Sequence, residues 1–103
     1  VSGIPKTIDI RTDEIRQALK DPVKRILDVI KDALEATPAE LSSDIIDRGI
    51  VLAGGGSQLR GLDQVLREKT GVPVNVADEP HLAIVKGCGA VIEDLEKYKH
   101  VLL

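Results

Sequence analysis

The most informative part of the chain is residues 49–58, which read GIVLAGGGSQ. A short uninterrupted apolar run followed by glycines is typical of a strand that is buried on both faces of a parallel sheet and ends in a tight turn. A second short strand is predicted by VPVNVA at residues 72–77. Between the two strands, apolar residues recur at the spacing of a helix: Leu59, Leu62, Val65 and Leu66. The stretch therefore predicts a β-α-β unit and an α/β fold.

The ends of the helix between these strands carry signals of their own. The hydroxyl of Ser57 can accept a hydrogen bond from a free backbone N–H at the start of a helix. Gly71 can adopt the left-handed conformation that commonly ends one. We therefore expect Ser57 to cap this helix, which runs to about Thr70, and Gly71 to terminate it.

Upstream of this unit the sequence pattern is mainly helical. Between residues 15 and 34, apolar residues recur at i, i+3 and i+4, and charged residues occupy the opposite face. Pro22 interrupts this pattern, and an aspartate followed by proline is a typical helix start. We therefore predict two helices here, near residues 13–20 and 22–36, the first of them capped by Thr12.

Three further elements complete the expected organisation. Isoleucines at even positions between residues 4 and 10 alternate with polar residues, which predicts an edge strand. Thr37 followed by Pro38 predicts the cap and first residue of a third helix, which stops before Gly49. A last helical pattern runs from residue 82 to residue 98 and is crossed by two glycines.

Composition excludes several classes of function. Of the 103 residues, 30% are charged and 43% are hydrophobic, which indicates a globular chain rather than a disordered one. The longest uncharged run is about half of the ~20 residues that a membrane-spanning helix requires, so no transmembrane segment is expected. With one aromatic residue and a net charge of -3, the chain lacks a stacking platform and a basic stripe. We therefore expect no nucleic-acid partner.

Two features suggest the setting of the chain. It opens with VSGIP rather than methionine and contains no methionine at all, so we expect it to be a piece of a longer protein. The single thiol, Cys88, can form no internal disulfide, which fits a reducing compartment. Cys88 stands between two glycines in a helical stretch, so we expect it to pack against a neighbouring element rather than to act as a nucleophile.

The glycine turn at residues 54–57 is the main candidate site. It lies between a strand and a helix start, where free backbone N–H groups can receive a phosphate. Gly56 and Gly61 have the spacing of a Walker A loop, but Leu62 stands where that loop needs its lysine. Leu59 occupies the third glycine position of the dinucleotide fingerprint. On these local grounds, a purely structural turn and a nucleotide contact both remain open.

No other cluster predicts chemistry. His81 and His100 are far apart and have no cysteine partners nearby, so no metal site is expected, and His81 is interpreted as a polar residue that opens a helix. Asp44 and Asp47 lie three residues apart on a predicted helix beside Arg48, which offers a solvated ion pair. We therefore predict no catalytic residue.

A family resemblance narrows the choice. The run DIIDRGIVLAGGG at residues 44–56, continued by LRGLD at 59–63, resembles the C-terminal part of MreB, the bacterial actin-like cell-shape family. Further matches extend the resemblance over nearly the whole chain: GIPKT at 3–7, TPAEL at 37–41, TGVPV at 70–74 and ADEP at 77–80.

The resemblance implies a fold and a partial site. Such proteins form two actin-like, ribonuclease H-like lobes around an ATP cleft. Residues 1–103 would be a single domain, the C-terminal portion of one lobe: subdomain IIA plus the helix that crosses between lobes. The glycine turn of the family lies at the adenosine end of the cleft. The resemblance therefore assigns nucleotide contacts to Gly54, Gly55, Gly56, Ser57 and Gln58.

The resemblance also implies a setting for the complete protein. It would bind ATP with Mg²⁺, hydrolyse it slowly and assemble into filaments at the cytoplasmic face of the inner membrane, where it organises wall synthesis with membrane partners. The catalytic residues of the family lie upstream of the part matched here. We therefore expect this chain alone to be non-catalytic and to hold no nucleotide.

Some positions depart from the usual family pattern. Ala53 replaces a threonine, Ser57 and Gln58 replace alanine and leucine, and Cys88 replaces a threonine between glycines. These departures leave two alternatives to a cell-shape protein. One is another actin-like filament, such as those of magnetosomes or plasmid segregation. The other is a self-contained α/β interaction module that binds no nucleotide.

Overall fold

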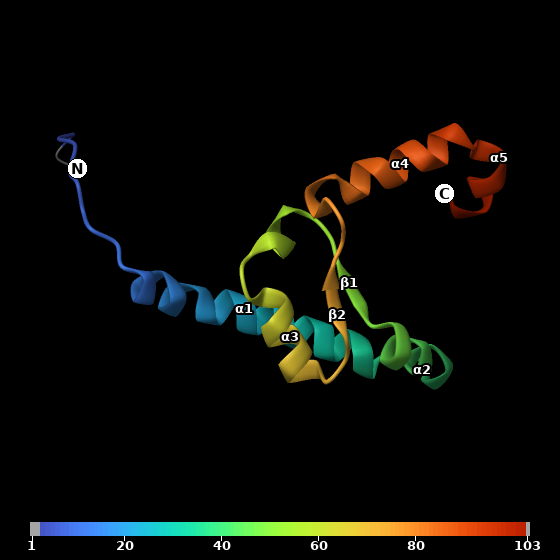
Figure 1. Cartoon of the computed structure of the whole chain (residues 1–103), viewed down its shortest axis with the longest axis horizontal. Coiled ribbons are helices and arrows are strands. Elements are labelled where there is room, and N and C mark those ends of the chain that lie inside the picture. The colour runs from blue at the N-terminus through green and yellow to red at the C-terminus, as the bar shows by residue number, and fades with distance from the viewer. Residues whose placement is uncertain (1–2, 103) are drawn as a thin grey trace. The chain divides into compact units, whose positions relative to one another are not determined.

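The computed structural model describes residues 3–102 (Figure 1). The chain divides into two compact units, the first ending at Glu35 and the second starting at Ala36. The first unit consists of an extended segment and one long helix, and the second contains the β-α-β unit and the C-terminal helices.

Residues 3–11 carry no regular secondary structure. The isoleucines that predicted a strand are largely exposed: Ile4 by 70%, Ile8 by 74% and Ile10 by 62%. The predicted strand is therefore wrong for this chain. A strand needs a neighbour to bond its backbone, and the one sheet within residues 3–102 is formed by two other segments.

The long helix α1 spans Thr12–Glu35 without a break. The prediction of two helices separated at Pro22 is wrong, because Pro22 lies inside α1. The apolar spacing keeps its phase across the proline, and no C-capping glycine precedes it, so losing one backbone hydrogen bond costs less than ending the helix. Thr12 is the first residue of α1, one position later than its expected role as a cap.

Helix α2 spans Ala39–Arg48, and its end is as predicted. Gly49 adopts a φ of 84°, and its N–H donates to the carbonyl of Ile45 over 2.8 Å. At the other end, Pro38 rather than Thr37 is the capping residue, and it provides no side-chain cap. Ser42 compensates from inside the helix, because its hydroxyl donates to the Pro38 carbonyl over 3.1 Å.

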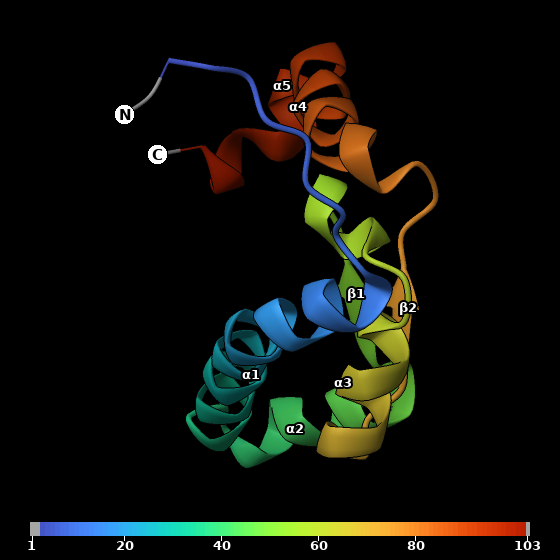
Figure 2. The same cartoon turned by 90° about the vertical axis from the view of Figure 1, so that its left-hand side faces the viewer.

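The predicted β-α-β unit is confirmed (Figure 2). Strand β1, Ile50–Leu52, pairs in parallel with β2, Val74–Val76, and Ile50 lies opposite Val74. Helix α3, Leu62–Thr70, connects the two strands. Most of the buried apolar residues belong to this unit: Leu62, Leu66, Val72 and Val74. The small core therefore lies between α3 and the strands.

Strand β1 is not buried on both faces, as its apolar sequence had predicted. Val51 is 65% exposed, whereas Ile50 and Leu52 are half-buried. Side chains alternate across a strand, so one covered face protects every second residue. Within the described residues, nothing covers the face that carries Val51.

The ends of α3 are partly as predicted. Gly71 is left-handed, with a φ of 70°, and its N–H donates to the Arg67 carbonyl over 3.0 Å. At the start, however, the capping position is held by Gly61 and not by Ser57. Ser57 belongs to a separate 3-10 turn, η1, at Gly55–Gln58, which precedes α3.

The C-terminal region is broken into short helices rather than one. The 3-10 turn η2, Pro80–Leu82, leads into α4, Ala83–Glu93, followed by α5, Leu95–Tyr98, and η3, Lys99–Val101. The break falls at Asp94, whose carboxylate accepts a hydrogen bond from the Lys97 N–H over 3.1 Å. Both predicted glycine crossings, Gly87 and Gly89, lie inside α4. Among residues 3–102, no helix has the length and apolar character needed to cross a membrane.

Candidate functional site

The glycine turn leaves the carboxyl end of β1 and contacts η2. Gly54 adopts a φ of 86°, which favours glycine. Its N–H donates to the carbonyl of Pro80 over 2.7 Å. Because the carboxyl ends of parallel strands meet at one edge of a sheet, the segments that follow β1 and β2 lie together there.

Gly55 and Gly56 differ from Gly54, because nothing in the described chain requires glycine at either position. Neither has a positive φ, and a Cβ added to either would meet no atom within 4 Å. The surface of the turn is therefore bare backbone that faces open space. Such a surface allows another molecule to approach the main chain without meeting side chains.

The amide groups of the turn are divided between internal bonds and free donors. The N–H of Ser57 donates to the Gly54 carbonyl and that of Leu59 donates to the Gly56 carbonyl, each over 3.2 Å. The first N–H groups of a helical turn have no partner within it. The N–H groups of Gly55 and Gly56 are therefore the donors that this turn presents.

Ser57 has a structural role in the turn. Its side chain is buried, and its hydroxyl donates to the Gly54 carbonyl over 2.6 Å. This bond holds the first glycine against the last part of the turn. The hydroxyl proton is thus engaged within the chain.

Gln58, the last residue of η1, contacts a residue that the sequence analysis did not include in the site. Its Nε2 lies 3.2 Å from Nδ1 of His81, the second residue of η2. His81 does open a helical segment, as predicted, but it also adjoins the glycine turn. Parallel strand topology was the available signal, since it brings the segments after both strands to one edge.

An ion pair lies on the other side of η2. Nζ of Lys86 on α4 pairs with Oε2 of Glu79, the residue before Pro80. Glu79 is the only non-glycine residue among those described that has a positive φ, at 44°. The charge of Lys86 is therefore committed to Glu79 rather than presented at the turn.

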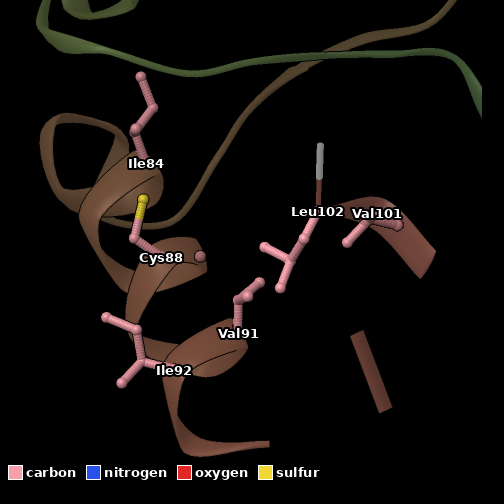
Figure 3. Close-up of a pocket in the computed structure, with 7 residues that line it drawn as sticks. Ile84, Cys88, Val91, Ile92, Val101 and Leu102 are labelled. Atoms are coloured by element: carbon pink, nitrogen blue, oxygen red, sulfur yellow. The ribbon is translucent and has the colours of Figure 1, made fainter. Parts of the chain in front are cut away.

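The remaining candidate residues do not join this site. Cys88 is exposed on α4, so the prediction that it packs against a neighbouring element is wrong. It lines an open apolar groove together with residues of α4 and the C-terminal segment, among them Val91 and Leu102 (Figure 3). Asp44 and Asp47 lie on α2. Within residues 3–102, no three His, Cys, Asp or Glu side chains are grouped so as to hold a metal ion.

The fold and the turn together define a class of protein. A β-α-β unit with a glycine turn at the carboxyl end of its strands is an α/β architecture that binds ligands at that edge. Comparison of whole chains makes the class specific. The structure is similar to crystal structures of MreB5 of Spiroplasma citri, one bound to ADP and one bound to AMPPNP, each with a TM-score of 0.84. The sequence identities are 30% and 31%, over 96% and 100% of this chain, and the fold is therefore actin-like.

The sequence agrees with this assignment. The sequence model of the MreB/Mbl protein family matches residues 1–100, and the chain belongs to that family. It is 45% identical over 97 residues to the cell shape-determining protein Mbl of Bacillus subtilis and 42% identical over 96 residues to MreB of Escherichia coli. The predicted family and fold class are thereby confirmed.

The chain corresponds to a minor part of these relatives. The alignments cover 94% and 93% of this chain but only 29% of the Mbl sequence and 28% of the MreB sequence. In the solved MreB5 chains the share is 30% and 31%. The activity of a family-length protein therefore depends largely on residues that have no counterpart here.

Proposed function

We propose that this chain supplies one wall of the adenosine pocket in an ATP-binding, filament-forming cell-shape protein. Gly54, Gly55, Gly56, Ser57 and Gln58 form that wall. The observation that carries the proposal is the bare backbone at Gly55 and Gly56, where glycine serves no purpose within the chain itself. The two solved relatives described as bound to ADP and AMPPNP support the proposal by analogy.

The roles are divided between this chain and the rest of a family-length protein. The turn offers backbone donors but carries no lysine for phosphates, and its nearest cation, Lys86, is paired with Glu79. Binding of Mg²⁺, positioning of the attacking water and slow hydrolysis would fall to the remaining part. Filament assembly, a cytoplasmic position at the membrane and contacts with wall-synthesis partners likewise belong to the complete protein.

We expect the chain alone to bind ATP weakly, with a Kd of about 1 mM or higher, because one open wall buries little of the ligand. Titration of the ¹⁵N-labelled chain with ATP, followed by NMR, should shift the amide signals of residues 54–58 first. Hydrolysis should be undetectable. Binding with a micromolar Kd would contradict the single-wall proposal, and unshifted signals at residues 54–58 would favour a purely structural turn.

The substitution Gly55→Val tests the wall directly. A branched side chain at this open position should leave folding intact but cover the backbone, so the shifts caused by ATP should fall about tenfold or disappear. Gly87→Val is the matched control, since Gly87 is also open and has no positive φ but lies on α4. Equal ATP responses in the two variants would remove the glycine turn from the site.

A further inference from the structure

The glycine turn is tied to η2 at both of its ends. At the first end, the Gly54 N–H donates to the Pro80 carbonyl over 2.7 Å. At the last end, Gln58 contacts the ring of the next residue, His81, over 3.2 Å. Both side chains of the second contact are exposed. An exposed contact of this kind adds little to folding stability, so stability does not account for it.

The chemistry of the contact leaves two groups free. When Nε2 of Gln58 donates to Nδ1 of His81, the ring proton of the neutral imidazole lies on its Nε2. Oε1 of Gln58 then remains as an acceptor and the Nε2–H of His81 as a donor. No other hydrogen bond of either side chain occurs within residues 3–102. The pair thus offers one acceptor and one donor beside the bare backbone of the turn.

We propose that Gln58 and His81 form a pair that recognises the base of the bound nucleotide, with His81 as a specificity residue. This inference rests on the proposed nucleotide site. Adenine presents an amino donor next to a ring-nitrogen acceptor, which complements the free acceptor and donor of the pair. Guanine presents an acceptor and a donor in the reverse order, so it fits only after the amide turns and the ring proton moves.

The charge distribution favours a base over a phosphate at this pair. A phosphate needs donors or cations, and the Gln58 oxygen would repel it. Lys86, the cation of the adjoining helix, pairs with Glu79 and adds no free positive charge. The free N–H groups of Gly55 and Gly56 are the donors suited to the remainder of the nucleotide.

Three ligands separate the base from the rest of the molecule: AMP, GMP and ribose 5-phosphate, which lacks the base. Each is titrated by NMR up to about 20 mM into the original chain and into His81→Ala. We expect the original chain to bind AMP several-fold more tightly than GMP. His81→Ala should weaken AMP binding about fivefold to tenfold and leave ribose 5-phosphate binding unchanged.

Two further variants separate specificity from a structural role. His81→Asn keeps one acceptor and one donor, so it should restore most of the preference for AMP. Glu79→Gln, which disrupts the ion pair on the other side of η2, should not alter that preference. Native amide spectra of every variant away from residues 54–58 and 79–82 establish that the chain is folded.

The outcomes distinguish this inference from the proposed function. If AMP shifts the amides of Gly54 to Gly56 equally in the original chain and in His81→Ala, the nucleotide site stands and the recognition pair is wrong. If ribose 5-phosphate weakens in parallel with AMP, His81 only shapes the turn and the inference fails. If none of the ligands shifts these amides, both proposals fall.

Discussion

At Gly49 the backbone adopts a φ of 84°, and a Cβ added there would lie 2.8 Å from the Cβ of Pro73 and would meet its carbonyl oxygen. That same carbonyl accepts the N–H of Ile50 over 2.7 Å. The residue therefore ends α2 and allows β1 to approach the segment that precedes β2. Both requirements exclude a side chain.

We expect Gly49→Ala to destabilise the second unit by about 2 kcal/mol or more, because the left-handed conformation and the contact with Pro73 both penalise a Cβ. Gly87→Ala is the matched control. Gly87 lies inside α4 with open space around it, so alanine there should add about 0.5 to 1 kcal/mol of stability. Urea unfolding of both variants measures the difference, and equal stabilities would contradict the steric explanation.

Residue-level signals were reliable where the requirement is local. Gly71 was predicted as a helix terminator because a left-handed residue depends only on its own backbone. Ser57 was misassigned, because its hydroxyl bonds to Gly54 within an intervening turn and α3 begins only after Gly61. The contact between Gln58 and His81 joins residues 23 positions apart, and no local pattern encodes it.

Among the elements, α1 shows how helix continuity can outweigh a proline. Pro22 lacks the N–H that would bond the carbonyl of Ala18 inside the helix, yet α1 continues through it. The sequence signal was read correctly as unfavourable but was given too much weight. The apolar stripe on both sides of Pro22 remained in phase, and that phase was the better predictor.

Pro22→Ala should therefore strengthen α1. An alanine restores the missing hydrogen bond and removes the ring, which is worth up to about 3 kcal/mol in a helix interior. Hydrogen exchange of the amides around residues 18–26 should slow by tenfold or more. Pro38→Ala is the control, since Pro38 lies at the start of α2, where an N–H has no helical partner. Unchanged exchange in Pro22→Ala would mean that Pro22 does not weaken the helix.

Strands depend on partners in a way that helices do not, which explains why their prediction was less complete. The two strands of the β-α-β unit were found because each lies beside the other, connected by one short helix. The segment at residues 4–10 has the same alternation but pairs with no other described segment. Its pattern records a preference for a sheet edge that is not supplied within residues 3–102.

At the scale of the whole molecule, the second edge of β1 has no partner among the described residues. Ile50 donates its N–H to Pro73, and Leu52 accepts from Ala77, so both direct their backbone groups towards the β2 side. Because these directions alternate along a strand, the N–H and carbonyl of Val51 face the other edge. An unpaired apolar edge is a template for another chain.

The last prediction follows from this edge. We expect the chain to self-associate at tens of micromolar, either by pairing at β1 or by adding the segment at residues 4–10 of a second copy, because unmet backbone groups cost about 1 to 3 kcal/mol each when buried. Val51→Lys places a charge on the edge strand and should shift the chain towards the monomer in sedimentation velocity. Val29→Lys, at a similarly exposed position on α1, should not. A monodisperse monomer of the original chain, with the β1 amides protected from exchange, would instead show that the edge is satisfied without a second copy.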